Sequence, residues 1–218
     1  MIDYLLLDLD NTLYSKESGL GKSMGARMGE FVARYLKISN EEASDMRRRG
    51  LHAYGTTMSW LVHEHGLDNV EEFIDYVHPR DLDSYLSNDD RVAAQTVLKT
   101  LDLPSSVLTN APREHADRIL EWLGIAGEID QIFDIRSNNF MGKPARSAYQ
   151  TALAAVGARP DTTLFVDDVL QYVLPFRDMG GHAVHVSDEA KHEPGITTIR
   201  SLVELVPLVE QERTRNDS

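Results

Sequence analysis

The chain has 218 residues, of which 42% are hydrophobic and 26% are charged, as expected for a globular protein with one large domain or a core and a smaller insert. Its 35 acidic and 22 basic residues give a formal net charge of -13, which disfavours a nucleic-acid polymer as partner because such a surface repels phosphate backbones. The chain contains no cysteine, which excludes disulfides, thiol nucleophiles and zinc sites with cysteine ligands.

The first residues, Met1 to Asp8, have no basic lead-in and reach acidic side chains at once. This pattern is neither that of a signal peptide nor that of a membrane span. We therefore expect a cytoplasmic protein without a membrane partner.

Short apolar runs recur along the chain, and each has the length and composition of a strand that is covered on both faces. They are Tyr4 to Leu7, Ser106 to Leu108, Gln131 to Ile135, Thr163 to Val166 and Ala183 to Val186. Amphipathic patterns at 116–123 and 202–209 repeat apolar side chains on one helical face. Strands that alternate with helices predict an α/β fold with a mostly parallel, doubly wound sheet.

One long region, from about Ser18 to Leu86, interrupts the alternation because no strand pattern occurs in it. Asn40-Glu41-Glu42 is typical of a helix start with acidic residues in its first turn. An earlier helical stripe, which we interpret as core packing, consists of Met24, Met28, Phe31, Val32 and Tyr35. We predict an all-helical cap at 18–86, which leaves 1–17 and 87–218 for the α/β core.

Polar residues follow the apolar runs, where open α/β sheets bind their ligands. They are Asp8, Asp10, Thr12, Thr109, Asn110, Lys143, Asp167 and Asp168. Each group alone has a plainer interpretation as a turn, a helix cap or a solvated loop. Their joint occurrence at successive strand ends favours one functional site.

Three of these carboxylates, Asp8, Asp167 and Asp168, would repel one another in one crevice. A hard divalent cation relieves that repulsion, and Mg²⁺ fits oxygen ligands best. With Lys143 it would accept a phosphate dianion that the net negative charge otherwise repels. Because residues two apart in an extended chain project to the same side, Asp8 can attack phosphorus while Asp10 transfers protons to and from the reacting oxygens.

Four segments in this order resemble the motifs of the haloacid dehalogenase superfamily, and the resemblance covers nearly the whole chain. They are Leu7-Asp8-Leu9-Asp10-Asn11-Thr12-Leu13-Tyr14, Leu108-Thr109-Asn110, Lys143-Pro144 and Phe165-Val166-Asp167-Asp168. The resemblance implies a Rossmann-like core with a helical cap inserted after the first motif. It also implies a nucleophile at Asp8 and an acid/base at Asp10, and an acidic residue at position 10 argues against dehalogenation.

The same resemblance implies two sets of binding residues. The magnesium ligands are the Asp8 side chain, the Asp10 backbone carbonyl and Asp167, with Asp168 acting directly or through water. Phosphate is held by Leu9, Thr109, Asn110 and Lys143.

The cap region carries a narrower resemblance, to the pyrimidine 5′-nucleotidase subgroup. It is carried by Tyr54-Gly55-Thr56-Thr57, His63-Glu64-His65-Gly66 and Asp75-Tyr76-Val77-His78. It implies nucleoside monophosphates such as UMP and CMP as substrates. Our candidates for the surface that faces the substrate are Tyr14, Tyr54, Thr56, Thr57 and Arg113. A helix turn at Tyr54 and Thr57, and a solvated charge at Arg113, are the alternatives.

Two further features concern metal binding. His63-Glu64-His65 lacks the spacing of a helical zinc pair, so we expect surface or packing roles for His52, His63, His65 and His78. The apolar run Val169 to Phe176 departs from the polar and small residues that related hydrolases usually carry there. Its Pro175 is expected to interrupt or kink a helix, and the run to weaken support for the metal loop.

The sequence therefore predicts a magnesium-dependent phosphomonoesterase that forms an aspartyl-phosphate. Its partner would be a small phosphorylated metabolite, and the resemblance of the cap favours a nucleoside 5′-monophosphate. The alternatives are a phosphotransferase or phosphomutase, a sugar-phosphate phosphatase on the same core, and a ligand-binding protein with weak catalysis.

Overall fold

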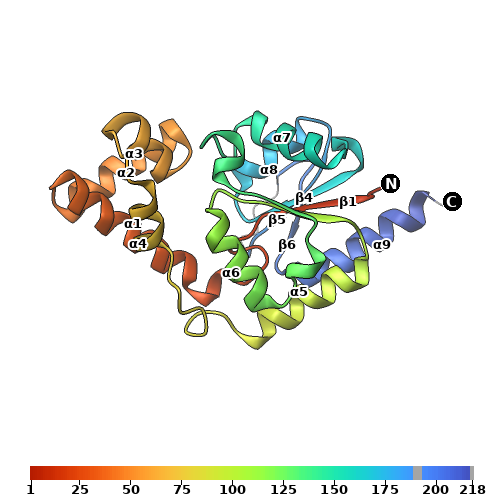
Figure 1. Cartoon of the computed structure of the whole chain (residues 1–218). Helices are drawn as coiled ribbons and strands as arrows, with labels where there is room; N and C mark the ends of the chain where they lie inside the picture. The colour runs from red at the N-terminus through yellow and green to blue at the C-terminus, as the bar shows by residue number, and fades with distance from the viewer. Residues whose placement is uncertain (189–192, 217–218) are drawn as a thin grey trace.

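A computed structural model describes residues 1–188 and 193–216 of the chain. Its six strands form one parallel sheet in the order β3-β2-β1-β4-β5-β6 (Figure 1). They are β1 (Tyr4–Leu7), β2 (Ser105–Leu108), β3 (Gln131–Phe133), β4 (Thr163–Asp167), β5 (His182–Val186) and β6 (Thr197–Ile199). The strand order reverses between β1 and β4, as in Rossmann-like sheets, and the crevice at such a switch point is the usual ligand site.

Helices cover both faces of the sheet, so the predicted doubly wound α/β architecture is confirmed. One face is covered by α5 (Asn88–Leu101), α6 (Arg113–Leu123) and α9 (Leu205–Asn216), and the other by α7 (Arg146–Val156) and α8 (Leu170–Arg177). Short 3-10 turns complete the described part: η1 (Lys16–Ser18), η2 (Ala126–Glu128), η3 (Ile135–Asn138), η4 (Pro160–Thr162) and η5 (Leu202–Glu204).

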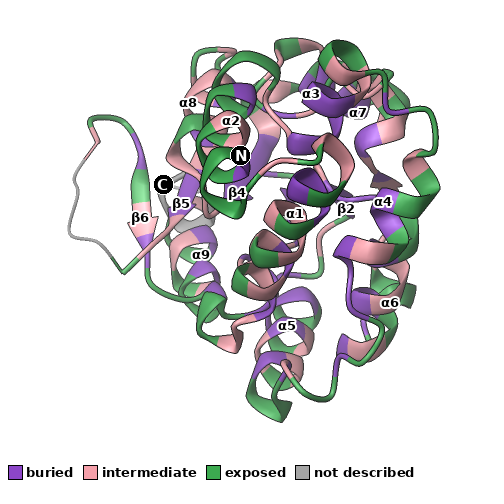
Figure 2. Cartoon of the chain, turned by 90° about the vertical axis from the view of Figure 1, so that its left-hand side faces the viewer, coloured by how far each residue is buried: buried purple, intermediate pink, exposed green. Residues whose placement is uncertain are grey.

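The two faces hold separate hydrophobic clusters because successive strand residues point to opposite sides. Leu5 and Leu7 of β1 join the cluster beneath α5, α6 and α9, whereas Leu6 joins the cluster with Tyr149 and Phe176. Figure 2 shows the matching pattern on the helices, whose buried residues lie on one side and whose exposed residues lie on the other. The predicted apolar runs therefore form strands, of which β1, β2 and β4 are buried on both faces.

Four helices fill the region without strands: α1 (Leu20–Leu36), α2 (Asn40–Tyr54), α3 (Thr57–His65) and α4 (Val70–Val77). They lie together to one side of the sheet (Figure 1). Ser39 caps α2 by accepting from the Glu42 N–H while the Glu42 carboxylate accepts from the Ser39 N–H, which explains why the acidic start predicts a helix. The division into a cap at 18–86 and a core at 1–17 and 87–218 stays a prediction.

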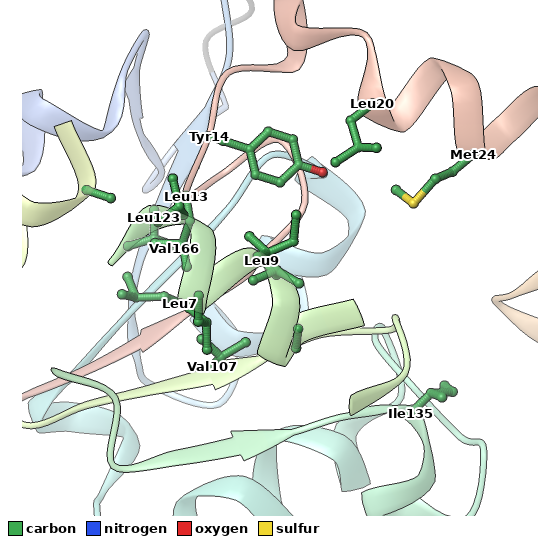
Figure 3. Packing of buried hydrophobic residues seen from close by; sticks show 14 of the residues in the cluster. Leu7, Leu9, Leu13, Tyr14, Leu20, Met24, Val107, Leu123, Ile135 and Val166 are labelled. Carbon is green, nitrogen blue, oxygen red and sulfur yellow. The ribbon is translucent and has the colours of Figure 1, made fainter. Parts of the chain in front are cut away.

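These helices share a hydrophobic cluster with the sheet, so the cap region is packed against the core. Figure 3 shows Leu20 and Met24 of α1 near Leu9, Leu13 and Tyr14, which follow β1. Within the described part of the chain, no helix combines the length and the apolar character that crossing a bilayer requires.

Candidate active site

The carboxylates of Asp8, Asp167 and Asp168 meet at the carboxyl ends of β1 and β4, as the sequence predicts. Leu7 pairs with Val166 across the two strands, and this register places the residues that follow side by side. One carboxylate oxygen from each of the three residues lies within 4.8 Å of the others. Asp8 is 6% exposed and Asp167 is fully buried, so their charges are largely removed from water.

Lys143 binds two of these carboxylates from the loop between η3 and α7. Its Nζ donates to Asp8 Oδ1 and to Asp167 Oδ2, both at 2.6 Å, and the side chain is 1% exposed. Burial alone would lower the pKa of Lys143, but Asp167 and Asp8 more than offset it and raise that pKa. The lysine is therefore a permanent cation at the base of the site.

The loop that carries Lys143 is fixed by the side chain of Asn110. Asn110 Nδ2 donates to the Lys143 carbonyl and Asn110 Oδ1 accepts from the Lys143 N–H, each at 2.8 Å. Gly142 makes this contact possible because a Cβ at that position would overlap Asn110 Oδ1. Asn110 therefore lies at the predicted phosphate site and also positions the lysine.

The acidic cluster fits a divalent cation. Three carboxylates and one ammonium leave an excess of two negative charges when all are ionised. Burial, followed by the charge of Asp8, raises the pKa of Asp168 to about 7, and burial also raises the pKa of Asp8 and of Asp167. A donor set made only of carboxylate oxygens suits a hard cation such as Mg²⁺.

Asp10 points to a different set of partners. Its Oδ1 accepts from the Tyr14 hydroxyl at 2.5 Å and lies 2.8 Å from Nε2 of His115. Since a carboxylate only accepts, Nε2 of the ring carries the proton. Burial alone would raise the pKa of Asp10, but His115 and then Tyr14 reverse the effect and lower it.

His115 is fully buried in the first turn of α6, and its ring lies 4.8 Å from the ring of His78, which follows α4. Sequence reasoning missed both contacts. The available signal was the position of His115, which shares the apolar face of α6 with Ala116 and Ile119. A polar residue on that face, at the end of the helix nearest Asn110, is directed toward the site.

Thr109 is buried beside this cluster. Its Oγ1 accepts from the Ala111 N–H at 3.0 Å, which leaves the hydroxyl hydrogen available for a phosphate oxygen. Leu9, the other predicted phosphate residue, has a fully buried side chain, so only its backbone can meet a ligand.

A cavity of about 270 Å³ lies between these residues and the helical region. From the core it is lined by Asp8, Asp10, Thr109, Asn110, Lys143 and Asp168, and from the helices by Met24, Met28, Arg47, Leu51, Thr56, Thr57, Met58 and Phe73. A second hollow, of about 860 Å³, shares Leu51, Gly55 and Tyr172 with it. The site therefore has a charged floor and a mostly apolar roof with one arginine.

The predicted substrate residues of the cap are divided between these two spaces. Thr56 and Thr57 line the cavity above Asp8. Tyr54 lines the second hollow instead, with its ring stacked on His63 at a centroid distance of 6.2 Å. Thr56 also caps α3 by accepting from the Ser59 N–H, so it has a structural role in addition to lining the cavity.

The other two predicted substrate residues line neither of these spaces. Tyr14 is 3% exposed because it packs in the hydrophobic cluster and donates to Asp10 (Figure 3). Arg113 is exposed, pairs with Asp117 at 2.8 Å and lines a separate surface hollow with Glu121. Tyr14 therefore binds Asp10 from the side away from the cavity. Arg113 has the alternative role of a surface charge.

Contrary to expectation, Pro175 in the apolar run after Asp168 does not interrupt the helix. α8 continues through Pro175 to Arg177. The loop that carries Asp167 and Asp168 is held by two contacts. The Val169 N–H donates to Asp167 Oδ1 at 2.8 Å, and Nε2 of His185 lies 3.1 Å from the Asp168 carbonyl oxygen. The backbone at the start of the run and His185 of β5 thus support the loop.

Comparisons with known proteins agree with this architecture. A family model described as haloacid dehalogenase-like hydrolase matches residues 2–180. Phosphate metabolism protein 8 of Saccharomyces cerevisiae is 27% identical over an alignment of 201 residues. The alignment covers 85% of this chain and 62% of that protein. The chain thus spans less than two thirds of that relative.

Solved structures show the same fold. A HAD phosphatase from Thermococcus onnurineus aligns with a TM-score of 0.67 and 19% identity, over 95% of this chain and 98% of that one. The L-2-haloacid dehalogenase of Xanthobacter autotrophicus aligns with a TM-score of 0.58 and 15% identity, over 96% and 99%. With the family model matching most of its length, the chain belongs to the haloacid dehalogenase-like hydrolases.

Proposed function

We propose that this hydrolase is a magnesium-dependent phosphomonoesterase that forms an aspartyl-phosphate on Asp8. The observation that carries the proposal is that Asp8 and Asp10 line one cavity with a buried lysine and two further carboxylates. A relative named for phosphate metabolism supports a phosphorylated substrate. The substrate would be a nucleoside 5′-monophosphate, as the resemblance of the cap sequence implies.

The first chemical step uses Asp8 as the nucleophile. One Asp8 oxygen forms a bond to phosphorus while the bond from phosphorus to the leaving oxygen breaks. Lys143 and the Thr109 hydroxyl hold the phosphate oxygens and stabilise their charge. Bound between Asp8, the Asp10 carbonyl, Asp167 and Asp168, Mg²⁺ would supply additional charge neutralisation at the transferring phosphate.

Asp10 transfers the protons. Both of its hydrogen bonds within the described residues fall on Oδ1, so Oδ2 is the oxygen that gives a proton to the leaving alkoxide. Before substrate binds, the lowered pKa keeps Asp10 ionised. Because a like charge disfavours a carboxylate, the entering phosphate raises that pKa and lets Asp10 carry the proton. Asp10 then takes a proton from the water that hydrolyses the aspartyl-phosphate.

The test is phosphate release by the purified protein with Mg²⁺ from p-nitrophenyl phosphate, nucleoside monophosphates and sugar phosphates. We expect release that Asp8→Asn abolishes and a preference for UMP or CMP. Equal activity of the Asn variant would contradict the nucleophile, and a preference for a sugar phosphate would contradict the nucleotide. Transfer of phosphate to a sugar acceptor without release would identify a phosphotransferase.

A further inference from the structure

Arg47 of α2 lines the same cavity as Asp8, from the opposite side, and its guanidinium has only neutral partners. Nε donates to Thr57 Oγ1 at 2.9 Å, Nη1 donates to the Gly25 carbonyl at 3.3 Å, and Nη2 lies 3.4 Å from Met28 Sδ. Across residues 1–188 and 193–216, no carboxylate lies within ion-pair distance of Arg47.

This environment is unusual for a partly buried arginine. Arg136, which is also partly buried, pairs with Glu71, Glu114 and Asp134. By contrast, Arg47 has no carboxylate partner among the described residues, and burial accordingly lowers its pKa. A cation taken from water without a partner is costly, so the position is explained best by a ligand that completes it.

The guanidinium retains the donors for such a ligand. Arginine carries five N–H groups in a planar fork, and three of them meet Thr57, Gly25 and Met28. Two remain, and the sulfur of Met28 is a weak acceptor. The acceptor of the ligand is therefore one oxygen or two adjacent atoms in the plane of a ring or carboxylate.

The acceptor belongs to the leaving group of the ester. In the proposed function the phosphate binds at the floor of the cavity, with Lys143 and Thr109, whereas Arg47 is in the roof among Met28, Leu51 and Phe73. Apolar side chains around one fixed donor suit a flat ring with a polar edge. A nucleobase has this form.

Building on the proposed function, we infer that Arg47 is a specificity-determining residue that donates to a carbonyl oxygen of the nucleobase. Uracil and cytosine carry such a carbonyl, as do guanine and hypoxanthine. Adenine has no carbonyl and presents an amino donor where guanine and hypoxanthine present O6. UMP, CMP and IMP are therefore preferred over AMP, and the pair IMP and AMP isolates the carbonyl at constant ring size.

The experiment measures kcat/KM of the full chain with Mg²⁺ for UMP, IMP, AMP and phenyl phosphate. Arg47→Met keeps the apolar stem and removes the donors, and Arg47→Lys keeps a charge without the fork. The matched control is Arg48→Met, because Arg48 is the neighbouring residue on α2, is exposed and pairs with Asp45. The informative quantity is the kcat/KM for UMP divided by that for phenyl phosphate in the same preparation. A loss of folded protein lowers both values equally, so it does not change this ratio.

We expect this ratio to fall about 10- to 100-fold in Arg47→Met, as for the loss of a hydrogen bond to a charged group. It falls less in Arg47→Lys and is unchanged in Arg48→Met, and the preference for IMP over AMP disappears in Arg47→Met. An equal loss for UMP and phenyl phosphate, which a contact to the phosphate or a purely structural role would produce, overturns the inference.

The wild-type measurements separate this inference from the proposed function. A wild type that does not prefer UMP to phenyl phosphate contradicts the nucleotide substrate before any variant is compared. A wild-type preference for UMP that survives in Arg47→Met contradicts only the role of Arg47.

Discussion

Nε2 of His115 lies 2.8 Å from Oδ1 of Asp10, and the two residues are 105 positions apart in the chain. The Tyr14 hydroxyl binds the same oxygen. This pair of donors fixes one edge of the carboxylate and leaves the other edge toward the cavity. Asp10, the proposed proton-transfer group, is therefore held by a residue of α6 as well as by its own turn.

The first prediction concerns this contact. His115→Phe keeps a ring in the buried position and removes the donor. We expect kcat/KM for alkyl phosphates to fall about 100-fold, the scale at which a misplaced catalytic group acts. Because p-nitrophenolate leaves without full protonation, kcat/KM for p-nitrophenyl phosphate should fall much less. Equal losses with both esters would show that His115 supports the fold rather than Asp10.

The second prediction concerns the loop that carries Lys143. Gly142→Ala places a Cβ against Asn110 Oδ1, so the amide that fixes the Lys143 backbone must move. We expect a fall in kcat of about 10-fold or more, because Lys143 then binds the phosphate less well. The control is Gly127→Ala, where a Cβ meets no atom within 4 Å. Full activity of Gly142→Ala would contradict the positioning role of Asn110.

The third prediction concerns the metal. Adding Mg²⁺ to protein treated with a chelator should raise the melting temperature, since a ligand that binds only the folded state stabilises it. Asp168→Asn removes one of the three carboxylates and should weaken the apparent affinity for Mg²⁺ about 10-fold. Asp3→Asn, at the other end of β1, is the control because Asp3 is exposed and distant from the cluster. Equal Mg²⁺ titrations for the two variants would place the ion elsewhere.

The fourth prediction concerns stability in acid. Burial, followed by the charge of His115, lowers the pKa of His78 from 6.5 to about 4, while Asp10 opposes the shift and Arg118 adds to it. As the pH falls, the unfolded chain takes up this proton before the folded chain does. Stability from His78 is therefore complete above about pH 6.5 and is lost as the pH falls toward 4, by roughly 3 kcal/mol in total.

Denaturant unfolding at several pH values measures this effect. His78→Phe removes the titrating group and should show a smaller loss of unfolding free energy between pH 6.5 and 4 than the wild type. His52→Phe, at an exposed position of α2, is the control and should keep the wild-type slope. An identical pH dependence of wild type and His78→Phe would exclude His78 as the source.

The sequence predicts the sheet and the acidic floor well, for a local physical reason. β1 and β4 are unbroken apolar runs, and the polar residues that end them must lie at one edge of a parallel sheet. β6 was not predicted because Thr197–Ile199 is a short edge strand without an apolar run. Local patterns therefore identify strands with an apolar run, including the edge strand β3, and miss the polar edge strand β6.

The residues above the floor could not be predicted in the same way. Tyr14 was a candidate for the surface that faces the substrate, but the turn after β1 directs its hydroxyl back to Asp10. Arg47 is distinguished by having no anionic partner in the described part of the chain, which depends on how α1, α2 and α3 pack. Such properties arise from tertiary contacts, and no spacing along the chain encodes them.

The contact between His78 and His115 has a further consequence, because one ring follows α4 and the other belongs to α6. A movement of α1–α4 that widens the cavity would also separate these rings and let water reach the side of Asp10 that faces away from the cavity. Substrate entry would then need the contact between His78 and His115 to open, whereas proton transfer by Asp10 would need it to stay closed. A variant that weakens this contact would speed ligand exchange and impair proton transfer by Asp10, so these two properties could not be improved together.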